Sequence, residues 1–308
     1  MRTRPTRIGT TRAVVALAGI ANCGFAIAQL ASFPRCASAQ LPAVAPAAEP
    51  VRAELVADVA SIQPGKPFRL AVRLTMTEGW HVNWINPGDA GLAPSVAWRL
   101  PDGFRAGLIE WPLPRRFSTG PLVIFGYGED VLLSVDVDTP ATRATGTSVE
   151  LVAEVSWLAC AEACVPGTGR VSLRLPVETT SRTNPEWKSR IDTARVRCPI
   201  QPAEWSVDAR VGDSSTLLLD LQTASETTPT LAGVFFFPLE QGLIENASAQ
   251  TLSAMPGPYG RVAYQLRVER ARIGVELPKR LTGILVCDSG WTAGAGPQAM
   301  TIDVPLGY

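Results

Sequence analysis

The sequence contains little histidine and methionine, and it carries no net charge. It contains one histidine, His81, and four methionines among 308 residues, which leaves few ligands for a transition-metal site. The 28 basic and 28 acidic side chains cancel, so neither nucleic acid nor an acidic surface is an obvious partner. The motifs GxGxxG, HExxH and GxSxG and the P-loop are absent, which removes the sequence signatures of phosphate binding, zinc proteolysis and the commonest serine hydrolases.

The N-terminus has the organisation of an export signal. Arginines at positions 2, 4, 7 and 12 precede an apolar run over residues 13–31, and Ala37-Ser38-Ala39 follows as a small-x-small cleavage site. We therefore expect a signal peptide over residues 1–39. The apolar run is also just long enough to remain as an uncleaved membrane anchor, although the polar residues Asn22 and Gln29 weaken that alternative.

After a Pro/Ala-rich stretch at 40–50, which is expected to be a flexible leader, apolar residues alternate with period two. This period is typical of strands with one buried face. The motifs NPGDAG, LPDG and GYG (126–128) are expected to be turns between strands. A β-sandwich is therefore predicted over residues 51–180. The clearest alternating faces are Phe68, Leu70, Val72, Leu74 and Met76; Val149, Leu151, Ala153, Val155 and Trp157; and Val171, Leu173, Leu175 and Val177.

The pattern changes at residues 181–199, where a short linker helix is predicted. Asn184 suits the N-cap and Pro185 the first helical position. Strand-like runs then resume at Trp205 and continue to MTIDVP near the end of the chain. We therefore predict an all-β protein with a second β-sandwich over residues 200–308. One face of the predicted helix is apolar and is formed by Trp187, Ile191 and Ala194.

Cleavage of the signal would remove two cysteines, Cys23 and Cys36, and leave four. An even number in an oxidising compartment suggests disulfides. The four are Cys160, Cys164, Cys198 and Cys287.

Cys160 and Cys164 lie in the connection between two predicted strands, and three intervening residues allow the bend that a disulfide needs. A bridge over so short a loop adds little stability, so reversible exchange explains the pair better than structure does. Exchange needs one thiolate that reaches a partner's disulfide and a second thiol that resolves the mixed disulfide. A structural hairpin bridge stays open as an alternative. So does a Cu(I) site, for which Met76, Met255, Met300 and His81 are the other ligands in the sequence.

Cys198 opens the second predicted domain and Cys287 ends one of its late strands. We expect a structural disulfide between them, worth about 4 to 5 kcal/mol in the chain-entropy model. Two free thiols or a second redox couple are the competing possibilities.

The residues around the cysteine pair resemble the periplasmic N-terminal domain of the DsbD and ScsB thiol:disulfide interchange proteins. The spacing CxxxC followed by Val-Pro is similar to the ScsB-like branch. The likeness covers most of residues 50–290 and is carried by EGWHVNWINPGDAGLAPSVAWRLPDGF (78–104), IEWPLPRRFSTGPLVIFGYGEDVLLSVDV (109–137), VSWLACAEACVPG (155–167) and FFFPLEQGLIENASAQ (235–250).

The resemblance implies immunoglobulin-like sandwiches and a redox role in the periplasm. A membrane-embedded thiol electron donor would reduce the pair, which would then reduce a periplasmic thioredoxin-fold acceptor, without a cofactor and as a monomer. By motif position Cys164 would form the mixed disulfide and Cys160 would resolve it. The family's cap loop corresponds to residues 115–130. Its aromatic candidates are Phe117, Phe125 and Tyr127, and a flanking aromatic strand would supply Trp80, His81 and Trp84. For each of these six, ordinary packing is the alternative role.

One departure from the family concerns electron supply. The membrane helices and the C-terminal thioredoxin-like domain of the family have no counterpart in these 308 residues. We expect either a separate membrane protein as donor or a changed function, such as a non-catalytic immunoglobulin-like binding or copper-handling protein.

Overall fold

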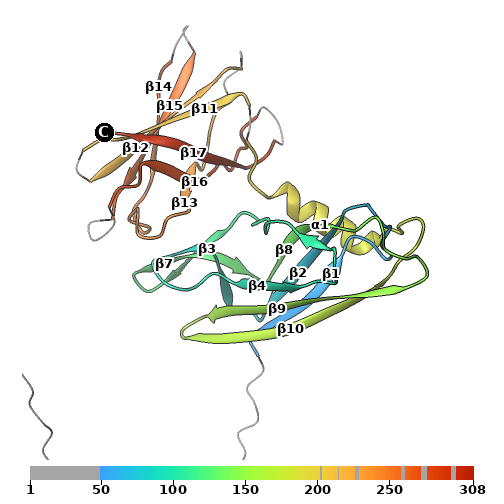
Figure 1. Ribbon diagram of the computed structural model, residues 1–308. Helices are drawn as coiled ribbons and strands as arrows, with labels where there is room; N and C mark the ends of the chain where they lie inside the picture. The colour runs from blue at the N-terminus through green and yellow to red at the C-terminus, as the bar shows by residue number, and fades with distance from the viewer. Residues whose placement is uncertain are drawn as a thin grey trace, which may run out of the picture. The chain divides into compact units, whose positions relative to one another are not determined.

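The computed structural model describes residues 49–201, 203–213, 215–225, 229–257, 261–271, 276–292 and 296–308. The predicted signal peptide and almost all of the leader lie outside the described residues. Within them the chain forms 17 strands and one helix (Figure 1). No helix among the described residues is long and apolar enough to cross a membrane.

Two sheets form the first sandwich. The first has the order β1-β2-β8-β5. The second has the order β10-β9-β3-β7-β6, with β4 also paired to β9. The strands of the first sheet are β1 (Val51–Ala57), β2 (Phe68–Met76), β8 (Asp130–Asp138) and β5 (Arg105–Ala106). Those of the second are β10 (Cys164–Pro176), β9 (Ser148–Cys160), β3 (His81–Gly88), β7 (Leu122–Gly128), β6 (Arg115–Thr119) and β4 (Ser95–Arg99).

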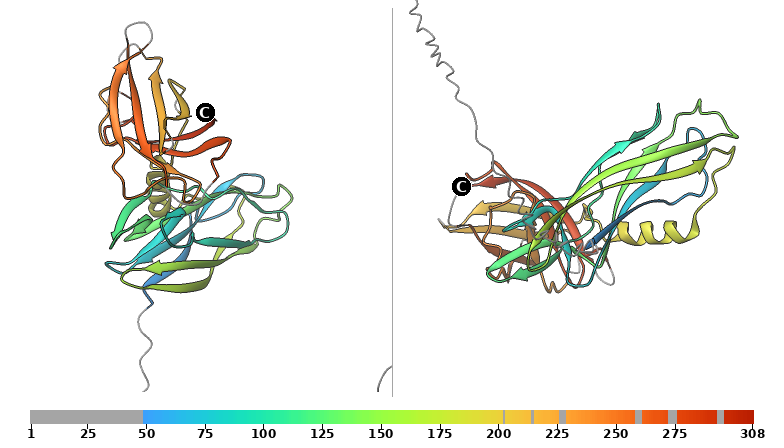
Figure 2. Two further views of the ribbon diagram at one scale, coloured as in Figure 1. Left: turned by 90° about the vertical axis from the view of Figure 1, so that its left-hand side faces the viewer. Right: turned by 90° about the horizontal axis from the view of Figure 1, so that it is seen from below.

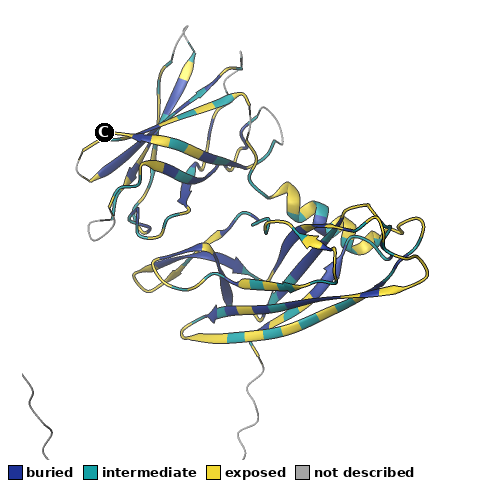
Figure 3. Ribbon diagram, in the orientation of Figure 1, coloured by how far each residue is buried: buried dark blue, intermediate teal, exposed yellow. Residues whose placement is uncertain are grey.

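The core between these sheets confirms the predicted alternation. Every second residue of β2 from Phe68 to Met76 and of β9 from Val149 to Trp157 is buried in one cluster. Of the third predicted face, Leu175 and Val177 are buried, whereas Val171 and Leu173 are only partly buried against the same cluster. Strand β10, at the edge of its sheet, is mostly exposed or intermediate along its length (Figure 3). The even-numbered residues of β9 therefore face away from the core, and Cys160 is one of them.

Helix α1 (Pro185–Val196) covers the outer face of the first sheet rather than acting only as a linker (Figure 2). As predicted, the Asn184 side chain caps it by accepting from the Trp187 backbone N–H, and Pro185 starts it. Ile191 is fully buried against Val56, Ala71 and Leu132, with Trp187 and Ala194 packed beside it. The predicted apolar face is thus confirmed.

The second sandwich is a seven-stranded sheet with the order β13-β16-β17-β11-β12-β15-β14. β11 and β17 pair in parallel over only two residue pairs, and side chains from both halves of the sheet fill one core. The strands are β13 (Phe235–Pro238), β16 (Arg280–Val286), β17 (Ala299–Gly307), β11 (Trp205–Val211), β12 (Thr216–Thr223), β15 (Val262–Glu269) and β14 (Thr251–Pro256).

One expected turn is wrong. GYG at 126–128 is the end of strand β7, not a turn. A Cβ at position 126 would collide with the carbonyl oxygen of Val82 on β3, so glycine is needed there for close backbone approach rather than for chain reversal. Sequence composition does not separate these two uses of glycine.

Candidate functional site

The two cysteines lie at the tip of a β-hairpin. Cys160 ends β9, Cys164 begins β10, and the register sets them directly opposite each other. Directly opposed residues of antiparallel strands project to the same face, and the two cysteines form a disulfide with Cα atoms 4.1 Å apart. Cys160 is 5% exposed, whereas Cys164 is an exposed residue. Cys164 is therefore the residue of the pair that is open to an external thiol, while Cys160 is largely covered by protein.

His81 continues this row across the sheet. It begins β3 and pairs directly with Cys160 on one side and with Gly128 of β7 on the other. Its neighbour Val82 faces the core opposite Ala159, so His81 and Cys160 share the outer face. His81 is nevertheless only 4% exposed, and this burial lowers its pKa. Burial therefore favours the neutral form of the imidazole.

Phe117 covers His81. The two rings stack with centroids 4.8 Å apart and planes within 8°. The Phe117 ring also lies against Gly128, where an added Cβ would meet it at 3.4 Å, an ordinary van der Waals distance. The structure thus brings Phe117 beside the cysteine row.

An open groove of about 900 Å³ adjoins the hairpin. Its walls come from residues 78–81, 116–119 and 161–163, and they include Trp80, His81 and Phe117. Glu78, Arg116 and Glu162 are the charged residues of its lining. Among the described residues, no group of three or more His, Cys, Asp or Glu side chains is arranged to hold a metal ion.

The other three aromatic candidates do not reach the cysteines. Phe125 is fully buried and packs against Phe235 and Phe237 of β13, while Trp84 contacts the edge of Phe237. On β7 the odd-numbered positions face the core, which is why Phe125 and Tyr127 are buried in the core cluster.

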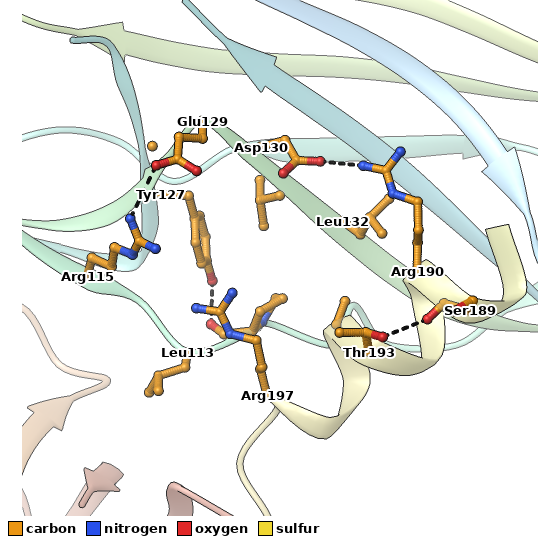
Figure 4. A pocket seen from close by; sticks show the side chains of 14 residues that line it. Leu113, Arg115, Tyr127, Glu129, Asp130, Leu132, Ser189, Arg190, Thr193 and Arg197 are labelled. Carbon is orange, nitrogen blue, oxygen red and sulfur yellow. Dashed lines mark hydrogen bonds and ion pairs between the residues drawn. The ribbon is translucent and has the colours of Figure 1, made fainter. Parts of the chain in front are cut away.

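Tyr127 lines a different cavity of about 280 Å³ between α1 and strands β7 and β8 (Figure 4). Its hydroxyl donates to the carbonyl of Pro112 at 2.7 Å, and burial raises its pKa well above the ordinary value. Ion pairs Arg115–Glu129 and Arg190–Asp130 flank this cavity.

The predicted disulfide between Cys198 and Cys287 does not form. Both cysteines are free. The Cys198 thiol lies after α1 and donates to the carbonyl of Ala194, whereas Cys287 is fully buried and donates to the carbonyl of Ala232. Each thiol donates to a carbonyl of its own surroundings. The disulfide that we expected from the even number of cysteines is therefore wrong.

Alkylation should distinguish these two thiols from the hairpin pair. Burial and the carboxylate of Glu110 raise the pKa of Cys198 to about 11. At about pH 8 its thiolate fraction, and hence its alkylation rate, should be roughly a hundredfold below that of an ordinary cysteine. Unfolding without reductant should expose Cys198 and Cys287 to labelling, and Cys160 and Cys164 should be labelled only after reduction. Peptide mass spectrometry measures this, and a peptide linking Cys198 to Cys287 would contradict it.

Sequence reasoning missed the supporting residues of the site. Gly128 and Arg116 belong to no recognisable sequence motif. The pairing of His81 with Cys160 depends on which strands are neighbours in the sheet, and the sequence does not give this. The alternation of Val82 and Trp84 could have placed His81 on the outer face. The resemblance named Phe117 as a candidate for the cap, but it did not predict that the ring stacks on His81.

Comparison with known proteins shows that the first sandwich is similar to a known family of domains. Residues 47–176 match the family model described as the N-terminal domain of the thiol:disulfide interchange protein DsbD. Among solved structures, the N-terminal periplasmic domain of ScsB from Proteus mirabilis is 16% identical, with a TM-score of 0.51 over 83% of this chain and 92% of that chain. At that identity the likeness supports the fold.

A second structural match is weaker, and no curated protein matches the chain. Spo0M, a sporulation control protein from Bacillus subtilis, is 9% identical, with a TM-score of 0.23 over 83% of this chain and 91% of that chain. Residues 47–176, the part of the chain that matches the family model of DsbD N-terminal domains, contain both cysteines of the hairpin.

Proposed function

We propose that the chain is an exported thiol:disulfide exchange module that passes electrons through Cys160 and Cys164. The observation that carries this proposal is the unequal exposure of the two sulfur-bearing residues. Cys164 is exposed at the hairpin tip, while Cys160 is 5% exposed behind it. Exchange needs this asymmetry, because one sulfur must meet the partner and the other must stay close enough to resolve the intermediate.

The reaction is two successive thiolate attacks. In the reduced protein, the Cys164 thiolate attacks a sulfur of the partner's disulfide, forms the mixed disulfide and releases the partner's other sulfur as a thiolate. The Cys160 thiolate then attacks the Cys164 sulfur, which re-forms the bridge and releases the second partner thiolate. Two electrons pass to the partner in each cycle.

We infer the partners from the resemblance to the DsbD and ScsB proteins. A membrane-embedded thiol protein would reduce the Cys160–Cys164 bridge, and a periplasmic thioredoxin-fold protein would accept the electrons. The match to a domain described as periplasmic supports this location. The family model that residues 47–176 match supports thioredoxin-like partners in general.

A trapping experiment tests the exchange. The variant Cys160→Ala retains the attacking thiol and lacks the resolving one, so incubation with oxidised thioredoxin should accumulate a covalent adduct. Non-reducing gel electrophoresis measures the adduct, and dithiothreitol should reverse it.

Cys164→Ala is the matched control, because it keeps, of the hairpin pair, only the buried Cys160 thiol and should form no adduct. The exchange function fails if Cys160→Ala forms no adduct and the wild-type bridge also resists dithiothreitol, as a purely structural bridge would.

A further inference from the structure

His81 lies directly beside Cys160, the resolving cysteine, on the neighbouring strand. The register aligns Cys164, Cys160 and His81 on three adjacent strands, all projecting to the outer face of the sheet. Directly opposed residues of this kind have Cβ atoms roughly 4.5 to 5.5 Å apart. The imidazole is thus the titratable group next to Cys160 across the sheet, on the side opposite Cys164.

We propose that His81 takes the proton of Cys160 as that thiol attacks the mixed disulfide. This inference rests on the proposed exchange function and assigns a positioning and proton-holding role within it. The buried surroundings of Cys160 explain why such a group is needed, since an isolated buried thiolate is strongly disfavoured.

The ring carries an unused polar atom. Nε2 of His81 is buried and has no hydrogen-bond partner among the described residues. Buried polar atoms without partners are rare, and each one calls for an explanation. In the disulfide state Cys160 has no proton to give, so an imidazole nitrogen reserved for that proton would be unpartnered in this state.

Three charged residues share the groove with His81, one from each segment that forms its walls. They are Glu78 before β3, Arg116 on β6 and Glu162 in the hairpin loop. Arg116 donates to the carbonyl of Asn246 at 3.0 Å and lies over the ring of Phe235. No ion pair joins any of the three to His81 among the described contacts, so the thiolate of Cys160 would be the main new charge beside the ring.

The proton of Cys160 can be followed through the whole step. The Cys160 thiol transfers its proton to the neutral imidazole, and the resulting thiolate bonds to the Cys164 sulfur as the partner sulfur departs with the bonding electrons. The imidazolium then returns the proton to the departing partner thiolate or to water. Before the attack, imidazolium and thiolate stabilise each other as an ion pair.

The single histidine makes this testable by NMR without assignment. In tag-free protein labelled at histidine, the ring signals report only His81. We expect the pKa of His81 to rise by about one pH unit or more on reduction of the bridge, because a neighbouring thiolate favours the imidazolium. Cys164→Ser and Cys160→Ser form the matched pair. The first keeps the Cys160 thiol and should retain the raised pKa, and the second should lose it.

Equal His81 pKa values in the oxidised and reduced proteins overturn the proposal, as does a rise that persists in Cys160→Ser. Neither result depends on a partner, so failure here is distinct from failure to trap an adduct.

Release of the partner gives a second readout. In His81→Gln, resolution of the mixed disulfide should be roughly tenfold or more slower at about pH 7 and should approach the wild-type rate as rising pH ionises Cys160 directly. Stopped-flow detection of partner release measures both rates. Equal rates at all pH values, or an equal loss at every pH as a purely structural defect would give, overturn the role.

Discussion

Phe125→Ala should cost about 3 to 5 kcal/mol of unfolding free energy, a large part of the stability of an ordinary domain. The ring is fully buried and lies 4.8 Å from Phe237 and 6.3 Å from Phe235 between centroids. Removing it leaves a cavity that the neighbouring strands cannot close without breaking β7 pairing. Denaturant unfolding followed by tryptophan fluorescence measures the loss.

Phe117→Ala is the matched control, since both residues came from the same predicted cap. Phe117 is only partly buried, so its loss should cost little stability. It uncovers His81, which pairs directly with Cys160, so an external thiol should then reach Cys160 as well as the exposed Cys164. Reduction of the bridge by dithiothreitol should therefore become roughly tenfold faster. A stability loss below about 1 kcal/mol for Phe125→Ala, or unchanged reduction in Phe117→Ala, would contradict this division of roles.

Gly126→Ala should destabilise the protein by about 3 kcal/mol and should also impair exchange. The new methyl group would be forced against the carbonyl oxygen of Val82, and strands β3 and β7 pair at this point. Because Val82 follows His81, separating the strands displaces the imidazole from Cys160. Denaturant unfolding and the rate of partner reduction measure the two effects.

Gly107→Ala provides the comparison. Its added methyl would meet only the carbonyl oxygen of Asp136 at 3.4 Å, an ordinary contact distance, and the position is exposed. We expect a change within about 0.5 kcal/mol. If the two alanine variants have equal stability, close backbone approach is not the reason for Gly126.

The sequence predicted the strands that build the first core, and it did so because one face of each is buried. The alternation along β2 and β9 carries this information directly. Helix α1 was also predictable, because its cap and its apolar face are local features. The cysteine pair could be found from its position between two such strands.

Pairing across the sheet was beyond that reasoning. Phe117, Phe125 and Tyr127 look alike in sequence, and their different roles depend on which face of which strand each one joins. The free state of Cys198 and Cys287 was missed for the same reason, since the distance between two thiols is set by the packing of separate elements. The alternation of apolar residues along a strand predicts which side chains are buried. It does not predict which side chains of separate strands come into contact.

The length of the β9–β10 hairpin has a consequence for repeated use. Each strand has 13 residues, paired in continuous register from Cys164–Cys160 to Pro176–Ser148. Opening the bridge removes one link at the end of this ladder and leaves the backbone pairing intact. The oxidised and reduced forms should therefore differ little in folding free energy. The domain should then pass through many cycles of reduction and oxidation without unfolding.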